Sequence, residues 1–438
     1  MEYSMNTIKE GVLCECGKVH PESRVGFSIK RGAICDLPKL CADFECKKAF
    51  VVADENTFAA AGKKVCSVFD ENSVAYTKYI FPSEKLEPNE NSVGSVIMHF
   101  DDKCDIIVGV GSGVINDICK IVSRVTARKY IIVATAPSMD GYASASSSVI
   151  RAGLKISLNS RCPDYIVGDL DVLCNAPKKM LAAGLGDMLA KYVSICEWRI
   201  SNLINGEYYC EKVASLVRKA VQDCVADPVG LMNRDETAVK AVFYGLVVGG
   251  ISMYYAGASR PASGVEHYFS HVWDMRAEEF GTPCELHGIQ CAIGTLMALK
   301  LYEKIKKITP DREKAKRFVE AFSYDEWKNV LSSYLGKAAD AMIALEKKEG
   351  KYDVQKHSAR LDVIIENWTK ILDIIDEELP GAEYIEKLLD IIDCPKRASE
   401  IGINEKDNPV TFAATKDIRD KYVLSRLAWD LGVIDEIM

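Results

Sequence analysis

The sequence predicts an N-terminal α/β domain, residues 1–176, followed by an all-α domain, residues 177–438. In the first part, short apolar runs each lead into a helical pattern, as buried parallel strands and their crossover helices do. From Lys178 onward, apolar residues recur at helical spacing with almost no strand signal. Pro177, which cannot sit inside a helix, marks the expected boundary.

The first domain begins its regular pattern with A-F-V-V-A-D, which predicts a buried strand ending at Asp54 before a crossover helix. A second strand is expected over Ser73–Phe81 and a helix over Ser92–Phe100. The alternating stretch Arg151–Asp171 predicts a β-ribbon that closes the domain. Ligands of open α/β sheets bind at the carboxyl ends of the strands, so Asp54 stands where a ligand would lie.

A glycine-rich turn follows a later strand in D-I-I-V-G-V-G-S-G-V-I-N-D-I-C-K, which contains Gly109, Gly111 and Gly113. Glycine allows a sharp turn and lets backbone N–H groups approach a phosphate at a helix N-terminus. The turn between a strand and a helix therefore predicts a nucleotide phosphate site in a Rossmann-like domain. It differs from the usual fingerprint, which follows the first strand.

The next strand, Y-I-I-V-A-T-A, runs into the small, polar stretch P-S-M-D-G-Y-A-S. Thr135, Ser138, Asp140 and Ser144 should lie at the same carboxyl edge as the glycine turn. A structural loop of this composition is common, but its position after a buried strand favours a ligand-binding loop.

In the second domain, helices are expected over five segments: Lys178–Leu203, Tyr208–Asp223, Asp235–Ala256, Val265–Arg276 and Ile289–Lys304. The apolar run Ala241–Ala258 carries Gly245, Gly249 and Gly250, which favours a buried helix with close neighbours over a membrane span. The lysine- and glutamate-rich residues 305–360 indicate solvated helix faces and loops.

Composition limits the possible partners and the compartment. A chain of 438 residues with 48% hydrophobic residues is long enough for two domains with substantial cores. Its formal charge of −8 argues against nucleic-acid or anionic-membrane partners. Sixteen scattered cysteines indicate reduced thiols rather than a disulfide framework, and the N-terminus has no signal-peptide pattern. We therefore expect a cytoplasmic protein.

Three of the six histidines lie close together in the sequence. On a helix, His267 and His271 would share one face, and His287 follows after a loop. Two imidazoles with one carboxylate are typical ligands of a divalent metal, and Asp187 in A-A-G-L-G-D-M-L-A-K-Y is the candidate carboxylate. The alternative is that the histidines are core residues and that Asp187 only pairs with Lys191.

A second cluster of possible ligands opens the chain. C-E-C-G-K-V-H brings Cys14, Cys16 and His20 close enough in sequence to suggest a zinc knuckle. A fourth ligand is not evident, so a strand-and-turn opening without a metal is the preferred interpretation.

Five motifs taken together resemble the glycerol-1-phosphate dehydrogenases: G-V-G-S-G-V-I-N-D, T-A-P-S-M-D-G-Y-A-S, G-L-G-D-M-L-A-K-Y, S-R-P-A-S-G-V-E-H-x-x-S-H and L-H-G-I-Q. That family shares a superfamily with glycerol dehydrogenase, iron-type alcohol dehydrogenases and dehydroquinate synthase. The resemblance covers residues 45–300, looks most like the bacterial branch, and implies a dehydroquinate synthase-like fold with the active site in the cleft between the domains.

The resemblance also implies a role for each matching residue. Asp54 would contact the adenosine ribose; Gly111, Ser112, Gly113, Val114 and Ile115 would hold the pyrophosphate; Thr135, Ser138 and Ser144 would line the nicotinamide side; Asp140 would contact substrate; Asp187, His267 and His287 would hold the metal; and Asp187 and His271 would serve catalysis and substrate binding. Ser112 and Val114 depart from many superfamily members, which have glycine and lysine there.

The implied reaction is the reversible reduction of dihydroxyacetone phosphate to sn-glycerol 1-phosphate. The expected cofactors are NAD, with NADP as an alternative, and one zinc, nickel or ferrous ion, in a homo-oligomeric protein without nucleic-acid or membrane partners. Arg260 is the nearest candidate in sequence for binding the substrate phosphate; alternatively it caps the preceding helix.

Other activities remain open at this stage. Another polyol or sugar-phosphate dehydrogenase and a non-catalytic nucleotide-binding regulator are alternatives. A dehydroquinate synthase-like lyase is a further one, although such enzymes carry Glu where this chain has Asp187.

Overall fold

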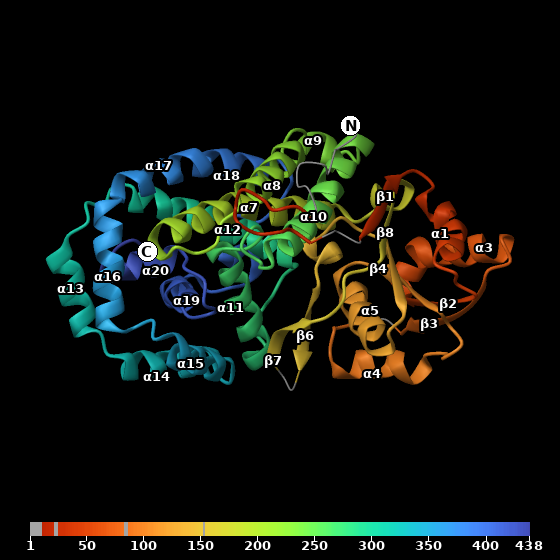
Figure 1. Ribbon diagram of the computed structural model, residues 1–438, viewed down its shortest axis with the longest axis horizontal. Coiled ribbons are helices and arrows are strands. Elements are labelled where there is room, and N and C mark those ends of the chain that lie inside the picture. The colour runs from red at the N-terminus through yellow and green to blue at the C-terminus, as the bar shows by residue number, and fades with distance from the viewer. Residues whose placement is uncertain (1–10, 22–24, 83–85, 152–153) are drawn as a thin grey trace.

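The computed structural model describes residues 11–21, 25–82, 86–151 and 154–438. A strand-rich part and a larger helical part lie side by side along the long axis of the molecule (Figure 1). The predicted fold class, an α/β part followed by an all-α part, is confirmed. Pro177 directly precedes the long helix α7 (Lys178–Asn205), the first of the helical part's large helices.

The N-terminal part is built on a six-stranded parallel sheet with the order β1-β8-β5-β4-β2-β3. The strands are β1 (Gly26–Lys30), β2 (Lys48–Asp54), β3 (Ala75–Phe81), β4 (Ile106–Gly111), β5 (Lys129–Ala134) and β8 (Tyr165–Asp169). Between them run the helices α1 (Leu37–Asp43), α2 (Glu55–Thr57), α3 (Lys63–Glu71), α4 (Glu90–His99) and α5 (Gly113–Thr126), and the short helix α6 (Leu170–Leu173) follows β8.

Both faces of this sheet are buried, which explains why its strands read as continuous apolar runs. Phe50 and Val52 of β2 pack into one core cluster, and their neighbours Ala49 and Val51 pack into another. Successive side chains of a strand point to opposite faces, so a strand covered on both faces needs apolar residues at every position.

The predicted β-ribbon over Arg151–Asp171 is partly wrong. The antiparallel hairpin consists of β6 (Ser146–Arg151) and β7 (Leu154–Asn159), while Tyr165–Asp169 forms the parallel strand β8 between β1 and β5. Strand β8 is short and has one glycine, so its apolar run was too brief to distinguish a core strand from a ribbon.

The helical part contains the five expected helices, with boundaries shifted by a few residues. They are α7 (Lys178–Asn205), α8 (Glu211–Cys224), α10 (Glu236–Ala256), α11 (Val265–Phe280) and α12 (His287–Ile305). Shorter helices complete it: α9 (Pro228–Met232), α13 (Arg312–Ala321), α14 (Tyr324–Leu335), α15 (Ala338–Glu349), α16 (Val354–Glu366), α17 (Trp368–Glu378), α18 (Ala382–Ile391), α19 (Asn408–Thr415) and α20 (Leu424–Asp430).

Helix α10 is the one helix among the described residues that is long and apolar enough to cross a membrane, and 72% of its most apolar 18-residue window is buried inside the protein. Its glycines allow close contacts. A Cβ on Gly250 would come within 2.8 Å of the Cβ of Ala143, and one on Gly249 within 3.2 Å of the Cβ of Asp140. Helix α10 therefore supports the loop after β5.

Glycines also set the spacing around α7. A Cβ on Gly184 would lie 1.8 Å from the carbonyl oxygen of Pro137, and one on Gly186 would lie 2.4 Å from that of Gly288. Hydrogen in place of a side chain lets these backbones touch. Asp187 follows directly in α7, so the same contacts bring it against the loop after β5 and the start of α12.

Candidate active site

Four side chains converge where α7, α11 and α12 meet. The ligand atoms of Asp187, His267, His287 and Cys291 all lie within 4.8 Å of one another. His267 Nε2 is 3.5 Å from Asp187 Oδ1, and Cys291 Sγ is 3.5 Å from His287 Nε2. The three residues singled out from the sequence thus lie together. Cys291 was missed, although its position one helical turn after His287 was a usable signal.

Both imidazoles have hydrogen-bonding partners on their outer nitrogens. Nδ1–H of His267 donates to Glu266 Oε1 at 2.8 Å, and His287 Nδ1 lies 3.1 Å from Ser270 Oγ. The Glu266 carboxylate can only accept, so this hydrogen bond places the His267 proton on Nδ1 and leaves Nε2 as the electron-pair donor. The inner nitrogens therefore face the carboxylate and the thiol. Glu266 is a further residue that sequence reasoning missed.

The electrostatics of the cluster favour a bound cation. Burial alone would raise the pKa of the Asp187 carboxyl, but the Lys191 ammonium and the two imidazoles hold that pKa well below its usual range. Burial would likewise lower the pKa of His267, but Cys291 and Asp187 raise it. Protons are thus stabilised on the imidazoles at the point where the four donors meet. A divalent cation there would experience the same attraction.

Lys191 connects this cluster to the loop after β5. Its Nζ is fully buried, 2.8 Å from Asp187 Oδ1 and 2.6 Å from Asp140 Oδ2. The backbone N–H of Asp140 donates to Asp187 Oδ2 at 2.9 Å. The pairing of Asp187 with Lys191, foreseen as an alternative to metal binding, therefore coexists with the donor cluster and also holds Asp140 in place.

His271 lies one turn after His267 on α11 and is partly exposed. Its ring stacks near that of His287, with 6.2 Å between the centroids. It is adjacent to the donor cluster but is not one of its four members.

The glycine turn lies at the carboxyl end of β4. Gly111 ends the strand, Ser112 precedes α5, and the helix starts at Gly113. A Cβ on Gly111 would come within 2.5 Å of the Ile115 side chain, so glycine is required there. Val114 follows in the first turn of α5. The backbone N–H groups of that turn are available to an anion in the way that helix N-termini allow.

The polar residues after β5 lie against this turn. The backbone N–H of Thr135 donates to the carbonyl of Gly111 at 3.1 Å, and the hydroxyls of Ser138 and Ser112 are 2.8 Å apart. Ser144 is held further along the loop by the buried ammonium of Lys120, at 3.2 Å. Strands β4 and β5 are neighbours in the sheet, so their carboxyl-end loops form one continuous surface.

Asp54 ends β2, which is the neighbour of β4 on its other side. Its Oδ1 accepts a hydrogen bond from the backbone N–H of Thr57 at 2.9 Å, which makes it the cap of α2. The side chain is therefore fixed at the sheet edge beside the glycine turn.

Arg260 lies in a different place from the one expected for a phosphate ligand. It is 2% exposed, its Nε donates to Glu207 Oε1 at 2.6 Å, and its Nη1 donates to the carbonyl of Tyr422 at 2.9 Å. Its Nη2 donates to the Ser201 hydroxyl. Ser201 and Asp187 both lie on α7, and the rise of a helix places them about 21 Å apart. These contacts correct the sequence-based interpretation and favour a structural role, through Glu207 rather than through a helix cap.

Comparisons with known proteins show what the chain is similar to. The family model described as "Iron-containing alcohol dehydrogenase" matches residues 28–177. Glycerol-1-phosphate dehydrogenase [NAD(P)+] from Halalkalibacterium halodurans is 33% identical over 303 residues, which cover 67% of this chain and 75% of that one. The enzyme of the same name from Methanosarcina mazei is 30% identical over 275 residues, which cover 63% of this chain and 75% of that one.

Solved structures show the same fold at low sequence identity. Glycerol dehydrogenase from Schizosaccharomyces pombe matches with a TM-score of 0.55 at 18% identity, covering 89% of this chain and 95% of that one. Sulfoacetaldehyde reductase from Bifidobacterium kashiwanohense, solved in complex with NAD+, matches with a TM-score of 0.60 at 12% identity, covering 95% and 97%.

The curated relatives define the class of the protein as an oxidoreductase. Within that class, the chain belongs to the glycerol-1-phosphate dehydrogenase family, as its motifs indicated.

Proposed function

We propose that this protein reversibly reduces dihydroxyacetone phosphate to sn-glycerol 1-phosphate with NAD(H), and more weakly with NADP(H), and that it needs one divalent metal ion held by Asp187, His267 and His287. The observation that carries the proposal is the buried donor cluster placed against Asp140 and Lys191, in a chain that belongs to the glycerol-1-phosphate dehydrogenase family.

The donors fit such an ion. A carboxylate and two imidazole nitrogens suit zinc, nickel or ferrous iron, and the Cys291 thiol within the same 4.8 Å adds a soft ligand that magnesium and calcium would not favour. A bound divalent ion acts as a Lewis acid that polarises a carbonyl oxygen. Glu266, through its bond to Nδ1 of His267, keeps the donor nitrogen oriented.

Lys191 gives the site its charge balance. Its ammonium is shared between Asp140 Oδ2 and Asp187 Oδ1, which places a positive charge between the two side chains and fixes the distance between them. The carboxylate of Asp140 can then accept a hydrogen bond from a substrate hydroxyl, because its position is set by its own backbone bond to Asp187.

Reduction of a ketone needs a hydride at carbon and a proton at oxygen. His271 is the proposed proton carrier, because its imidazole is partly exposed and lies next to His287, and imidazole is the side chain that most often serves as a general acid or base. In the oxidation direction the same ring nitrogen would take the proton from the substrate hydroxyl.

The nicotinamide cofactor would occupy the carboxyl edge of the sheet. The turn from Gly111 to Ile115 would meet its pyrophosphate; Thr135, Ser138 and Ser144 would line its nicotinamide side; and Asp54 would accept hydrogen bonds from the adenosine ribose. A carboxylate at that position would repel a 2′-phosphate, so the preference for NADH over NADPH follows from Asp54.

The test is the oxidation of NADH by purified protein loaded in turn with zinc, nickel or ferrous iron. We expect turnover with dihydroxyacetone phosphate, much weaker turnover with dihydroxyacetone, and none in His267→Ala. Binding of NADH without turnover under every metal condition would refute the enzyme assignment and support a regulatory protein. Faster turnover with another phosphorylated ketone would contradict the assignment of dihydroxyacetone phosphate as the substrate, but it would not contradict the proposed mechanism.

A further inference from the structure

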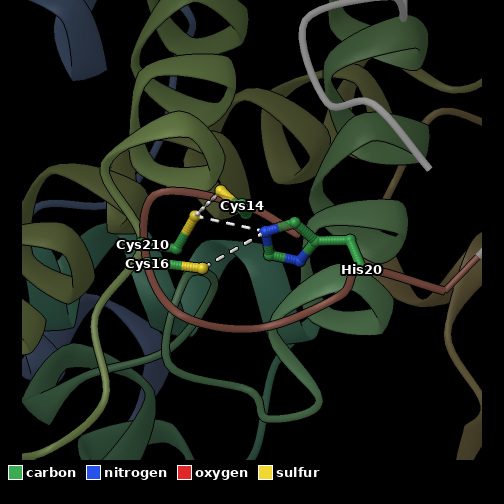
Figure 2. Close-up of side chains that lie close together, drawn as sticks. All are labelled: Cys14, Cys16, His20 and Cys210. Atoms are coloured by element: carbon green, nitrogen blue, oxygen red, sulfur yellow. Dashed lines mark hydrogen bonds between the residues drawn. The ribbon is translucent and has the colours of Figure 1, made fainter. Parts of the chain in front are cut away.

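A second group of metal-type donors lies away from the active site. Cys14, Cys16 and His20 come from the loop that precedes β1, and Cys210 comes from the residue before α8; their four ligand atoms lie within 4.8 Å of one another. Figure 2 shows the three sulfur atoms and His20 Nε2 pointing toward a common centre. Cys210 is the fourth ligand that the sequence alone did not reveal.

The distances match a tetrahedral ion better than a disulfide. His20 Nε2 is 3.5 Å from Cys16 Sγ and 3.5 Å from Cys210 Sγ, and the sulfur atoms of Cys14 and Cys210 are 3.9 Å apart. Zinc–ligand bond lengths of about 2.3 Å to sulfur and 2.0–2.1 Å to nitrogen place tetrahedral ligand atoms about 3.6–3.8 Å apart. A disulfide would need about 2.05 Å, and all four groups are free thiols or imidazole.

The surroundings prepare these ligands for a cation. Nδ1 of His20 is 3.0 Å from the carbonyl oxygen of Tyr255, so Nδ1 carries the proton and Nε2 offers its electron pair to the thiols. The Tyr208 hydroxyl lies 3.4 Å from Cys16 Sγ and can donate to a thiolate. Cys210 occupies the N-cap of α8, where the helix N-terminus stabilises a negatively charged sulfur.

The loop itself is shaped to present its ligands. The backbone N–H of Cys14 donates to the carbonyl of Lys18 at 2.8 Å, and the N–H of Gly17 donates to the carbonyl of Cys14 at 2.9 Å. Gly17 has φ +82°, which a residue with a side chain rarely adopts. The tight turn brings both cysteine side chains to the same side of the loop.

The group is closed and mostly buried: His20 is 1% exposed, Cys14 9% and Cys210 0%. Four protein ligands leave no open position for a substrate, which is the arrangement of structural zinc rather than catalytic zinc. The ligands also belong to different parts of the chain. The loop leads into β1 of the α/β part, whereas Cys210 and Tyr255 belong to the helical part.

We propose that Cys14, Cys16, His20 and Cys210 bind one zinc ion in a closed Cys3His site, separate from the catalytic metal, and that this ion fastens the N-terminal loop to the helical part. The site explains why two buried thiols, one half-buried thiol and a buried imidazole converge in a region without catalytic groups.

The first experiment separates the two metal sites. His267→Ala/His287→Ala removes both imidazoles of the active site and leaves the Cys3His group intact. After expression in zinc-supplemented medium and removal of loosely bound metal, elemental analysis should give one zinc per chain, and X-ray absorption should give a shell of three sulfurs and one nitrogen. An absence of metal in this variant, or a shell without sulfur, would refute the proposal.

The second experiment removes a ligand. Cys210→Ser should lose one zinc per chain relative to wild type and melt at a lower temperature, while Cys35→Ser, which removes an exposed thiol elsewhere, should change neither. Cys210→Ser with wild-type zinc content would refute the ligand assignment. If Cys210→Ser fails to fold, the X-ray absorption measurement on His267→Ala/His287→Ala still tests whether the Cys3His group binds zinc.

The two proposals can fail separately. If the active-site metal assignment is wrong, wild type and His267→Ala/His287→Ala will hold the same amount of metal. If the Cys3His assignment is wrong, wild type and Cys210→Ser will hold the same amount.

Discussion

Replacing Gly288 by alanine should disrupt the active site without touching a ligand. A Cβ at this position would lie 1.9 Å from the carbonyl oxygen of Ala183 in α7, whereas real Cβ atoms essentially never approach closer than 3.0 Å. The neighbour is backbone, so it cannot rotate away. Helices α7 and α12 would have to separate by about 1 Å, and overpacking of this kind costs about 1–3 kcal/mol of folding stability.

The separation acts directly on the proposed metal ligands. Asp187 stands on α7 and His287 is the first residue of α12, so the two donors would move apart with their helices. Metal–ligand distances tolerate only about 0.2 Å, so a shift of about 1 Å should lower metal affinity strongly. We expect Gly288→Ala to purify with little metal and to lose most of its activity.

Gly94→Ala is the matched control. Gly94 lies inside α4, and nothing is within 4 Å of the position its Cβ would take, so alanine should leave metal content and activity unchanged and raise stability by up to about 1 kcal/mol. Metal content, NADH oxidation and melting temperature should be measured for both variants. If Gly288→Ala keeps full metal content and activity, the close contact of α7 with α12 does not set the site.

Four further outcomes follow from the structure. Glu266→Gln weakens the orientation of His267 and should lower metal affinity or activity about 10- to 100-fold, measured by metal titration. Alanine at His271 should keep the metal but lose turnover, which elemental analysis and steady-state kinetics separate. Alanine at Arg260, a buried and paired cation, should cost about 3 kcal/mol of stability and lower kcat/KM equally for phosphorylated and unphosphorylated substrate; a selective loss with the phosphate would restore its role as a ligand. Burial and a neighbouring carboxylate raise the pKa of Glu197 to about 8, so its stability contribution should fall as pH rises from 4.5 to 8, by about 1.4 kcal/mol per pKa unit, and denaturation curves of Glu197→Gln should lack that slope.

The sequence predicted those strands and helices that are determined by the pattern of apolar residues within a short segment. Apolar runs such as residues 49–54 identified core strands, and helical periodicity placed α7, α8, α10, α11 and α12 within a few residues. The sequence could not order the strands, because the pairing of β1 with β8 joins residues more than a hundred positions apart. The sequence-based prediction also placed β8 in the same ribbon as the hairpin, because a strand of five residues is too short to show a distinctive pattern of apolar residues.

The candidate sites show the same limit more sharply, because proximity in sequence is a poor guide to proximity between helices. Arg260 precedes the metal-type histidines by only a few residues, yet its side chain turns to Glu207 at the far end of α7. Cys210 lies 190 residues after His20, yet their ligand atoms are 3.5 Å apart. In both cases the side-chain positions depend on how segments that are distant in sequence pack together. Arg260 is a buried cation that pairs with the Glu207 carboxylate, so it is assigned a structural role. Three thiols around one imidazole nitrogen are instead placed to share a cation, so they are assigned as metal ligands.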